Sequence, residues 1–398
     1  MPALLLGIGR GFTIPVVPII AKDEFGATVA AASLMIVAPM VGAVLATLPT
    51  GYLIDRIGRR KMLIAAPLLT SASAFLVWRA TSYSELLVYM TIGGIAQQMW
   101  QMSRLAAIAD IGQQNQRGRQ ITGMAGVQRF GTLIGPLAGG VVGEVFGLRV
   151  PFIAYGVMAL FAAVPSYMLI KESAPTVLAR RVGRSADDDG VDTSWKALLT
   201  FPVLVLFAAQ FMVNVGRGGA QGNGGPYFIF AAYAFGTGPA TLGALSFATG
   251  LIGVPVTISA GHIMDRFGRK RTIVPASVLL GAGLGFMSAV ALAGLGFGYY
   301  VVAFVVINLA VSLMAGSMQT LGSDIAPPQA RGKFFGLNRL IAEGGSLTNP
   351  ASFGMVTALV AGSGGFGASF AIMGGAALVA SLMVAGLLRE TLQRSPRT

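Results

Sequence analysis

The sequence predicts an all-α membrane protein of twelve transmembrane helices, arranged as two pseudo-symmetric six-helix bundles. Three observations support this prediction: the composition, the length of the apolar stretches and a motif that occurs twice. Apolar side chains make up 54% of the 398 residues and charged ones only 11%, too few to cover the surface of a soluble protein. The formal charge of +13 is therefore interpreted as a record of membrane topology, and a soluble nucleic-acid-binding protein is excluded.

The apolar stretches are about 17–25 residues long, the length that crosses a bilayer core. They do not alternate every second residue, so they are helices rather than strands of a membrane barrel. The expected spans are 2–21, 28–52, 62–78, 84–109, 121–146 and 150–170 in the first half, and 200–233, 239–262, 272–293, 298–323, 334–360 and 366–388 in the second. Residues 171–196 are expected to be a cytoplasmic linker between a bundle at 1–170 and a bundle at 197–398.

The first span has two unusual features. Pro2 opens an apolar run that lacks a basic region and a small-residue cleavage site, so we expect a retained helix rather than a signal peptide. Only nine residues precede Arg10, which predicts a first helix that is short of its cytoplasmic turns.

The distribution of basic residues predicts the orientation. With the N-terminus inside, the cytoplasmic segments hold 20 of the 28 Lys and Arg, whereas the outer loops hold only Lys22, Arg79 and Arg149. Because Lys and Arg are enriched in cytoplasmic loops, both termini are expected on the cytoplasmic side of a plasma or inner membrane.

The two halves repeat four landmarks in the same order. The stretch GYLIDRIGRRK at 51–61 returns as GHIMDRFGRKR at 261–271. Asp110 precedes Arg117 by seven residues, as Asp324 precedes Arg331. Arg117 and Arg331 each precede a proline by nineteen. Parallel six-helix repeats with a substrate site between them are a known transporter architecture.

The repeated loop resembles the hallmark G-x-L-x-D-R-x-G-R-R of the major facilitator superfamily, and with two copies the chain is identified as a member. Its glycines permit close helix approach and a tight turn, and its aspartates can accept N–H groups at a helix start. The resemblance implies a latch that closes the cytoplasmic side. The latch residues would be Gly51, Asp55, Arg59 and Asp110, and Gly261, Asp265, Arg269 and Asp324. Alternatively, these loops only set topology and contact anionic lipid headgroups.

The fifth expected helix carries a second family motif. Gly131, Gly135, Pro136, Gly139 and Gly140 look like the antiporter motif of the drug-proton exporters of the superfamily. Proline removes a helical hydrogen bond and glycines admit another backbone, so the motif predicts a bent, tightly packed pivot. Ordinary small-residue packing is the alternative. The fourth helix departs from the exporters, because the stretch 89–94 lacks their early arginine.

Charged residues within spans are the candidates for substrate binding, because each is costly in a bilayer. Arg10 and Arg217 hold equivalent places in the two halves, a position that resembles the organic-phosphate exchangers of the superfamily. On the fourth helix, Gln97, Gln101 and Arg104 share one face beside Trp100. We expect a net positive cavity for an anionic or neutral substrate. Purely structural pairing of these arginines is the alternative.

The candidate proton-coupling residues are Glu343 and Arg129, which stand seven residues before Pro350 and Pro136. Burial would raise the pKa of the Glu343 carboxyl and let it carry a proton. Arg339, one turn earlier, could instead neutralise it.

The sequence therefore predicts a monomeric, proton-coupled exporter of small organic molecules that works by alternating access. An organic-anion or organic-phosphate exchanger or importer of the same fold is the first alternative, and a transport-inactive receptor or scaffold is the second. No cofactor, metal, enzymatic activity or nucleic-acid partner is expected. The chain has no cysteine, a single histidine and no Gly-Lys-Ser/Thr phosphate loop.

Overall fold

The computed structural model describes residues 2–111, 117–169, 198, 200–218, 224–327 and 330–390. The chain forms two compact units, residues 1–190 with 236–247 and residues 191–235 with 248–398. Along the chain the division falls between residues 190 and 191, and residues 236–247 belong with the first unit. The predicted linker at 171–196 lies outside the described residues.

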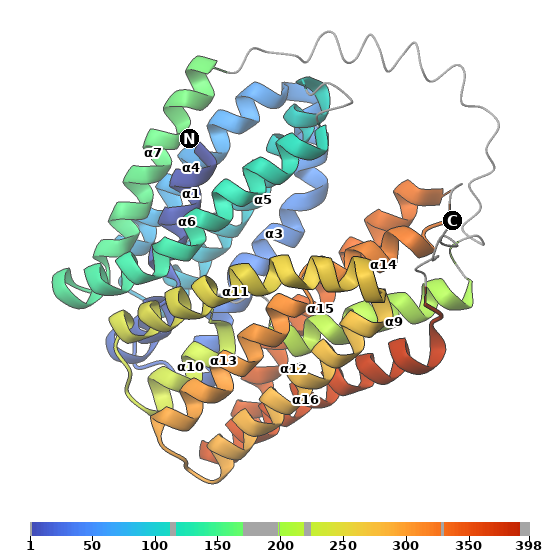
Figure 1. The fold of residues 1–398 in the computed structure, drawn as a ribbon. Helices are drawn as coiled ribbons and strands as arrows, with labels where there is room; N and C mark the ends of the chain where they lie inside the picture. The colour runs from blue at the N-terminus through green and yellow to red at the C-terminus, as the bar shows by residue number, and fades with distance from the viewer. Residues whose placement is uncertain are drawn as a thin grey trace, which may run out of the picture. The chain divides into compact units, whose positions relative to one another are not determined.

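The first unit contains the helices that correspond to the first six predicted spans (Figure 1). They are α1 (Pro2–Thr13), α2 (Val17–Ile19), the π-helix η1 (Ile20–Glu24), α3 (Val29–Ile57), α4 (Arg59–Arg79), α5 (Tyr83–Ile111), α6 (Arg117–Phe146) and α7 (Val150–Leu169). The second unit contains α9 (Phe201–Arg217), α10 (Gly225–Ala234), most of α11 (Pro239–Phe267), α12 (Arg269–Leu292), α13 (Phe297–Leu313), α14 (Ser317–Ile325), α15 (Arg331–Leu359) and α16 (Gly362–Leu387).

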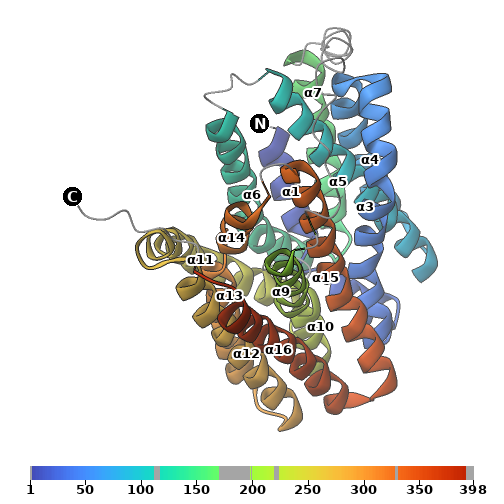
Figure 2. The same cartoon turned by 90° about the vertical axis from the view of Figure 1, so that its right-hand side faces the viewer.

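The packing within each unit repeats, as the sequence predicts. In the first unit α1 packs on α6 and α7, and α4 packs on α5 and α7. In the second unit α9 packs on α15 and α16, and α12 packs on α13 and α16, the equivalent pairs (Figure 2). Among the described residues, eight helical stretches are long and apolar enough to cross a membrane. The prediction of an all-helical protein with two related bundles is confirmed.

Three predicted spans are interrupted rather than continuous. The span at 2–21 breaks at residues 14–16, beside Pro15 and Pro18. The span at 200–233 stops at Gly218 (φ 77°) and resumes after Gly224 (φ 82°), and the span at 298–323 breaks at Gly316 (φ 81°). Proline lacks the N–H that a helix needs, and a residue with positive φ cannot continue a right-handed helix.

Aromatic rings form the core of the second unit around α10. Tyr227 stacks on Phe370 with ring centroids 5.8 Å apart, and the Tyr300 hydroxyl donates to the Tyr227 carbonyl over 3.1 Å. The other rings of the cluster are Phe228, Phe230, Phe304, Phe353 and Phe366. These contacts hold a ten-residue helix that is too short to be stable alone.

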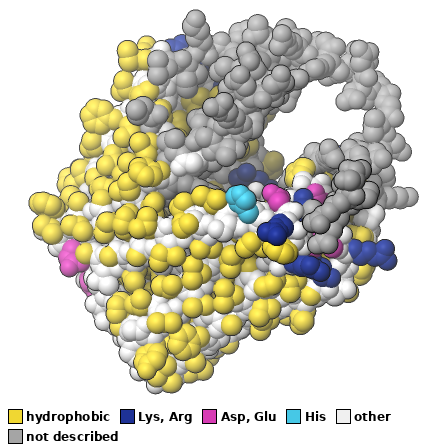
Figure 3. All heavy atoms as spheres, viewed as in Figure 1, with side chains coloured by type: hydrophobic (Ala, Val, Ile, Leu, Met, Phe, Trp, Pro, Cys, Tyr) yellow, Lys and Arg dark blue, Asp and Glu magenta, His cyan; other side chains and the backbone are white. Residues whose placement is uncertain are grey.

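Hydrophobic side chains also cover much of the outside of the helices. On the face shown in Figure 3 they spread over the middle of the second unit, whereas Lys, Arg, Asp and Glu side chains gather near one end. Exposed residues of α11 such as Leu251, Val254 and Ile258 are 53–60% uncovered by protein. A belt of this kind is the surface that a transmembrane helix presents to lipid.

Candidate functional site

Arg104 on α5 is the best-defined charged group within a span of the first unit. Its side chain is 9% exposed. Nη1 donates to Gln128 Oε1 and Nη2 donates to Gln101 Oε1, each over 2.7 Å. In the described part of the chain no carboxylate pairs with this guanidinium. The two neutral amides satisfy N–H groups without cancelling the positive charge, which suits a site for an anion or a neutral acceptor.

The predicted polar face of the fourth helix is present in part. Gln101 and Arg104 meet, and Gln97 is half-buried on the same helix. Trp100 is 5% exposed and packs in a core cluster with Leu6, Leu63, Ala66, Ala159 and Ala162. Its indole N–H has no hydrogen-bond partner among the described residues, and its role in substrate binding stays a prediction. Gln128 was missed, although it stands three residues before Gly131 and so shares a helix face with the α6 motif.

Arg10 and Arg217 each lie at a helix end beside a break. Arg10 is in the last turn of α1, and the Thr13 hydroxyl donates to its carbonyl over 2.9 Å. Arg217 is the last residue of α9 and precedes Gly218. Interrupted helices at matching places in the two halves are a marker of transporter binding sites. Both arginines therefore remain candidates for substrate binding.

The end of α9 is surrounded by buried polar atoms. Asn349 on α15 donates from Nδ2 to the Val215 carbonyl over 2.5 Å. Asn349 Oδ1, the Tyr227 hydroxyl oxygen and Gln210 Oε1 have no hydrogen-bond partner among the described residues. Buried polar atoms are normally satisfied, so three unpaired acceptors in one helix environment are unusual, and those of Asn349 and Tyr227 lie beside Gly218. In the sequence, the only signal of these polar contacts was Asn349, which directly precedes Pro350.

The α6 motif forms the contact between α6 and α1. A Cβ built on Gly135 would lie 2.6 Å from Gly11 Cα and from the Ile8 carbonyl oxygen, and one on Gly131 would lie 2.9 Å from Ile8 N. A Cβ on Gly139 would overlap the Phe12 backbone. We call the contact of Gly131, Gly135 and Gly139 with Ile8, Gly11 and Phe12 the glycine ridge. It confirms the predicted close packing, and α6 remains helical through Pro136.

The other end of α6 packs against residues 236–247 within the first unit. A Cβ on Gly140 would overlap the Pro239 carbonyl, and Gly243 abuts the Pro136 carbonyl in the same way. Glu144 Oε2 accepts the Ala240 N–H over 2.9 Å at the start of α11. A carboxylate at a helix N-terminus satisfies a free N–H and favours the helix dipole.

The two repeated loops make the predicted tight turn. Gly58 (φ 101°) joins α3 to α4, and Gly268 (φ 110°) joins α11 to α12. The close helix approach predicted at Gly51 and Gly261 is not seen within either unit. Among the described residues, a Cβ on Gly51 would meet only Met102 Cε at 3.9 Å, and one on Gly261 would meet nothing within 4 Å. The latch role of both glycines stays a prediction.

The predicted ion pair of the second loop is present. Arg269 Nε lies 3.0 Å from Asp324 Oδ2, and the two side chains are 16% and 27% exposed. In the first loop Arg59 is 6% exposed. The side chains of Asp55 and Asp110 lie outside the described residues.

Glu390 caps α12, a contact that sequence reasoning missed. Its carboxylate accepts the N–H of Arg269 over 2.9 Å and that of Lys270 over 3.1 Å. The predicted N–H acceptor of this loop was Asp265, but at the start of α12 Glu390 takes this role. Arg389-Glu390 echoes Lys171-Glu172 of the first half, which was the available signal.

The predicted burial of Glu343 is wrong. Its side chain is 52% exposed, and Oε1 lies 3.8 Å from Arg339 Nη2. One helical turn separates the two residues, so their side chains lie on the same helix face. The side chain of Arg129 lies outside the described residues.

The sequence matches the family model of the Major Facilitator Superfamily over residues 3–350 and 225–398. The chain therefore belongs to the major facilitator superfamily and is a multi-pass membrane transporter rather than an enzyme. Within that class it is similar to Multidrug resistance protein 2 of Bacillus subtilis, with 26% identity over 88% of this chain and 85% of that protein. It is also 29% identical to Quinolone resistance protein NorA of Staphylococcus aureus, over 42% of this chain and 43% of that protein.

Solved structures agree on the fold. A D-xylose-proton symporter superposes with a TM-score of 0.77 at 18% identity, covering 98% of this chain and 97% of that one. A bacterial homologue of the iron transporter ferroportin superposes with a TM-score of 0.72 at 14% identity, over 96% of each chain. In the described part of the chain, no group of three or more His, Cys, Asp or Glu residues could hold a metal ion.

Proposed function

We propose that this protein is a proton-coupled exporter of small organic molecules and works by alternating access as a monomer. The observation that best supports export is the glycine ridge, built by a motif that resembles the antiporter motif of drug-proton exporters. The similarity to Multidrug resistance protein 2 over most of both chains supports the same class of substrate. Both termini would lie in the cytoplasm, with the protein in the plasma or inner membrane.

The favoured substrates are anionic or neutral. The hydrogen-bond partners of Arg104 are neutral amides, which do not cancel its positive charge. Arg10 and Arg217 flank the breaks of α1 and α9, and unsatisfied oxygens of Asn349 and Tyr227 stand beside the second break. Acceptor groups on a substrate would bind the guanidinium groups, and donor groups would bind those oxygens.

An exchanger or importer of organic anions is the second candidate. Arginines at matching positions of the first helix in each half favour it, since paired guanidinium groups bind carboxylate or phosphate in bidentate geometry. Such a protein would concentrate substrate in the opposite direction or exchange one anion for another without a proton.

Latching of the cytoplasmic side would use the Arg269–Asp324 pair with Asp265, and their counterparts Arg59, Asp110 and Asp55 in the first half. Breaking and remaking these contacts would bias the closed and open arrangements of that side.

The experiment is substrate transport by proteoliposomes under an imposed proton gradient. Uphill export should follow the gradient and stop when it is collapsed. If Glu343 carries the coupling proton despite its exposure, Glu343→Gln abolishes uphill accumulation and leaves downhill counterflow within about twofold, because a permanently neutral side chain cannot release a proton.

Arg339→Gln is the matched control, since it removes the ion pair and keeps the carboxylate. If Glu343→Gln still accumulates substrate with the wild-type pH dependence, Glu343 is not the coupling residue. If accumulation runs without any proton gradient, the exchanger is the better assignment.

A further inference from the structure

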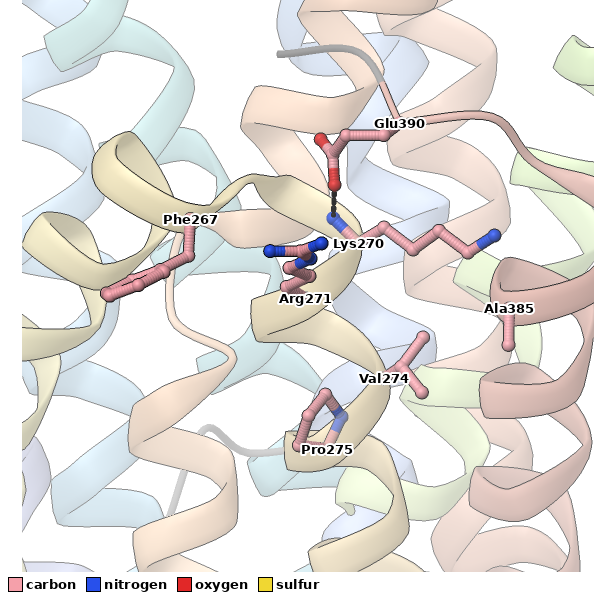
Figure 4. Close-up of a pocket in the computed structure, with 7 residues that line it drawn as sticks. All are labelled: Phe267, Lys270, Arg271, Val274, Pro275, Ala385 and Glu390. Atoms are coloured by element: carbon pink, nitrogen blue, oxygen red, sulfur yellow. Dashed lines mark hydrogen bonds between the residues drawn. The ribbon is translucent and has the colours of Figure 1, made fainter.

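A cavity of about 610 Å³ lies in the second unit, where α12 begins and α16 ends. Figure 4 shows Val274, Pro275 and Ala385 on its walls, and Lys270, Arg271 and Glu390 around its upper rim. Phe267 borders it from the end of α11. The cavity therefore has apolar walls and a charged rim.

The rim is net positive. Lys270 extends toward α16, where its Nζ donates to the Leu388 carbonyl over 3.1 Å, and Arg271 points to the other side (Figure 4). Lys270, Arg271 and Glu390 together give the rim a net charge of +1. The Glu390 carboxylate already accepts two backbone hydrogen bonds at the start of α12.

The apolar walls continue along the outside of the same two helices. Val278 on α12 and Leu378, Leu382 and Leu387 on α16 are 41–71% uncovered by protein. Here α12 and α16 approach so closely that a Cβ on Gly281 would lie 2.6 Å from Leu378. An apolar strip of this kind is the surface that acyl chains cover in a bilayer.

We propose that this cavity binds an anionic phospholipid, with its phosphate at Lys270 and Arg271 and its acyl chains along α12 and α16. Charge complementarity selects the headgroup, and the apolar strip selects a lipid over a free phosphate. The orientation expected from the basic loops puts this end at the cytoplasmic leaflet, whose anionic lipids attract basic groups. The bound lipid would lie beside the turn that holds Arg269 against Asp324.

The test is native mass spectrometry of the purified protein in detergent, titrated with phosphatidylglycerol or with phosphatidylcholine of the same chains. We expect tighter binding of phosphatidylglycerol. Lys270→Gln/Arg271→Gln should weaken it by about 25-fold, since ~1 kcal/mol for each basic residue corresponds to about fivefold. Arg266→Gln, which removes a charge from the same loop outside the cavity lining, should change binding by less than about twofold.

A second variant keeps the proposal testable if the double variant does not fold. Ala385→Phe fills the cavity without removing a charge and should also weaken phosphatidylglycerol binding, while thermal unfolding shows that the protein remains folded. Equal binding of the two lipids, or wild-type phosphatidylglycerol binding by both variants, would overturn the proposal. Equally tight binding of glycerol 3-phosphate would overturn the lipid assignment and leave a phosphate site.

Discussion

Arg104 illustrates how a single charge is placed within a span. Its fork-shaped guanidinium binds two glutamine oxygens, one from its own helix and one from α6. The hydrogen bonds offset part of the cost of burial, while the two neutral amides leave the positive charge uncancelled. Spacing along α5 predicted that Gln101 and Arg104 share one helix face. It could not predict Gln128, because a contact between residues 24 positions apart depends on how two helices pack.

Arg104→Lys should separate these two roles. A lysine keeps the charge but has no fork, so one charge-assisted hydrogen bond is lost, at a cost of about 1.5–3 kcal/mol in unfolding free energy. Unfolding by SDS titration in mixed micelles measures this cost. Repeating the substitution in a Gln128→Ala background isolates the contact, and an unchanged cost there would show that the Gln128 bond contributes nothing.

At the scale of elements, the contact between α1 and α6 leaves no room for side chains at its glycines. Gly131, Gly135 and Gly139 let two backbones approach, as small residues do between membrane helices. The motif predicted this contact because its glycines recur every four residues. The interruptions at Gly218 and Gly316 were not predictable in the same way. The chain has 55 glycines, and only local packing decides which of them adopts a positive φ.

Gly135→Ala should disrupt the glycine ridge. The added methyl group would lie 2.6 Å from Gly11 and Ile8, and overpacking of this kind costs about 1–3 kcal/mol. Transport should fall by at least about fivefold, measured as initial export rate per folded protein. Gly126→Ala on the same helix is the control, since its Cβ meets nothing within 4 Å. Similar effects at the two positions would refute the special role of the ridge.

At the scale of the whole molecule, the repeat of the first half in the second half makes much of the fold predictable from the sequence. Span lengths follow from bilayer thickness, and repeated landmarks such as Asp110 and Asp324 reveal the two halves. Contacts between residues that are far apart in the sequence are harder to predict. Glu390 caps a helix that begins 121 residues earlier, and no local pattern marks it. Glu343 was expected to be buried because it lies within a span, but position along a helix does not fix which face is covered.

Exchanging the charges of the Arg269–Asp324 pair tests whether the pair acts in transport. Arg269→Asp and Asp324→Arg should each lower the transport rate by at least about fivefold, because each places like charges together. The double variant should recover to within about threefold of wild type, as expected for directly coupled residues. Arg266→Asp, in the same loop, controls for the change in net charge. A double variant no better than either single variant would argue against the pair.

The open faces at Gly126 and Gly261 also make this chain suitable for spectroscopic distance measurement. Because the sequence contains no cysteine, a thiol introduced at either position would be unique without removal of any native residue. A Cβ there would meet no described residue within 4 Å, so a nitroxide label would perturb packing little. One position is on α6 and the other is on the part of α11 in the second unit. A doubly labelled protein would therefore report, by electron paramagnetic resonance, the change in separation that accompanies each transport step.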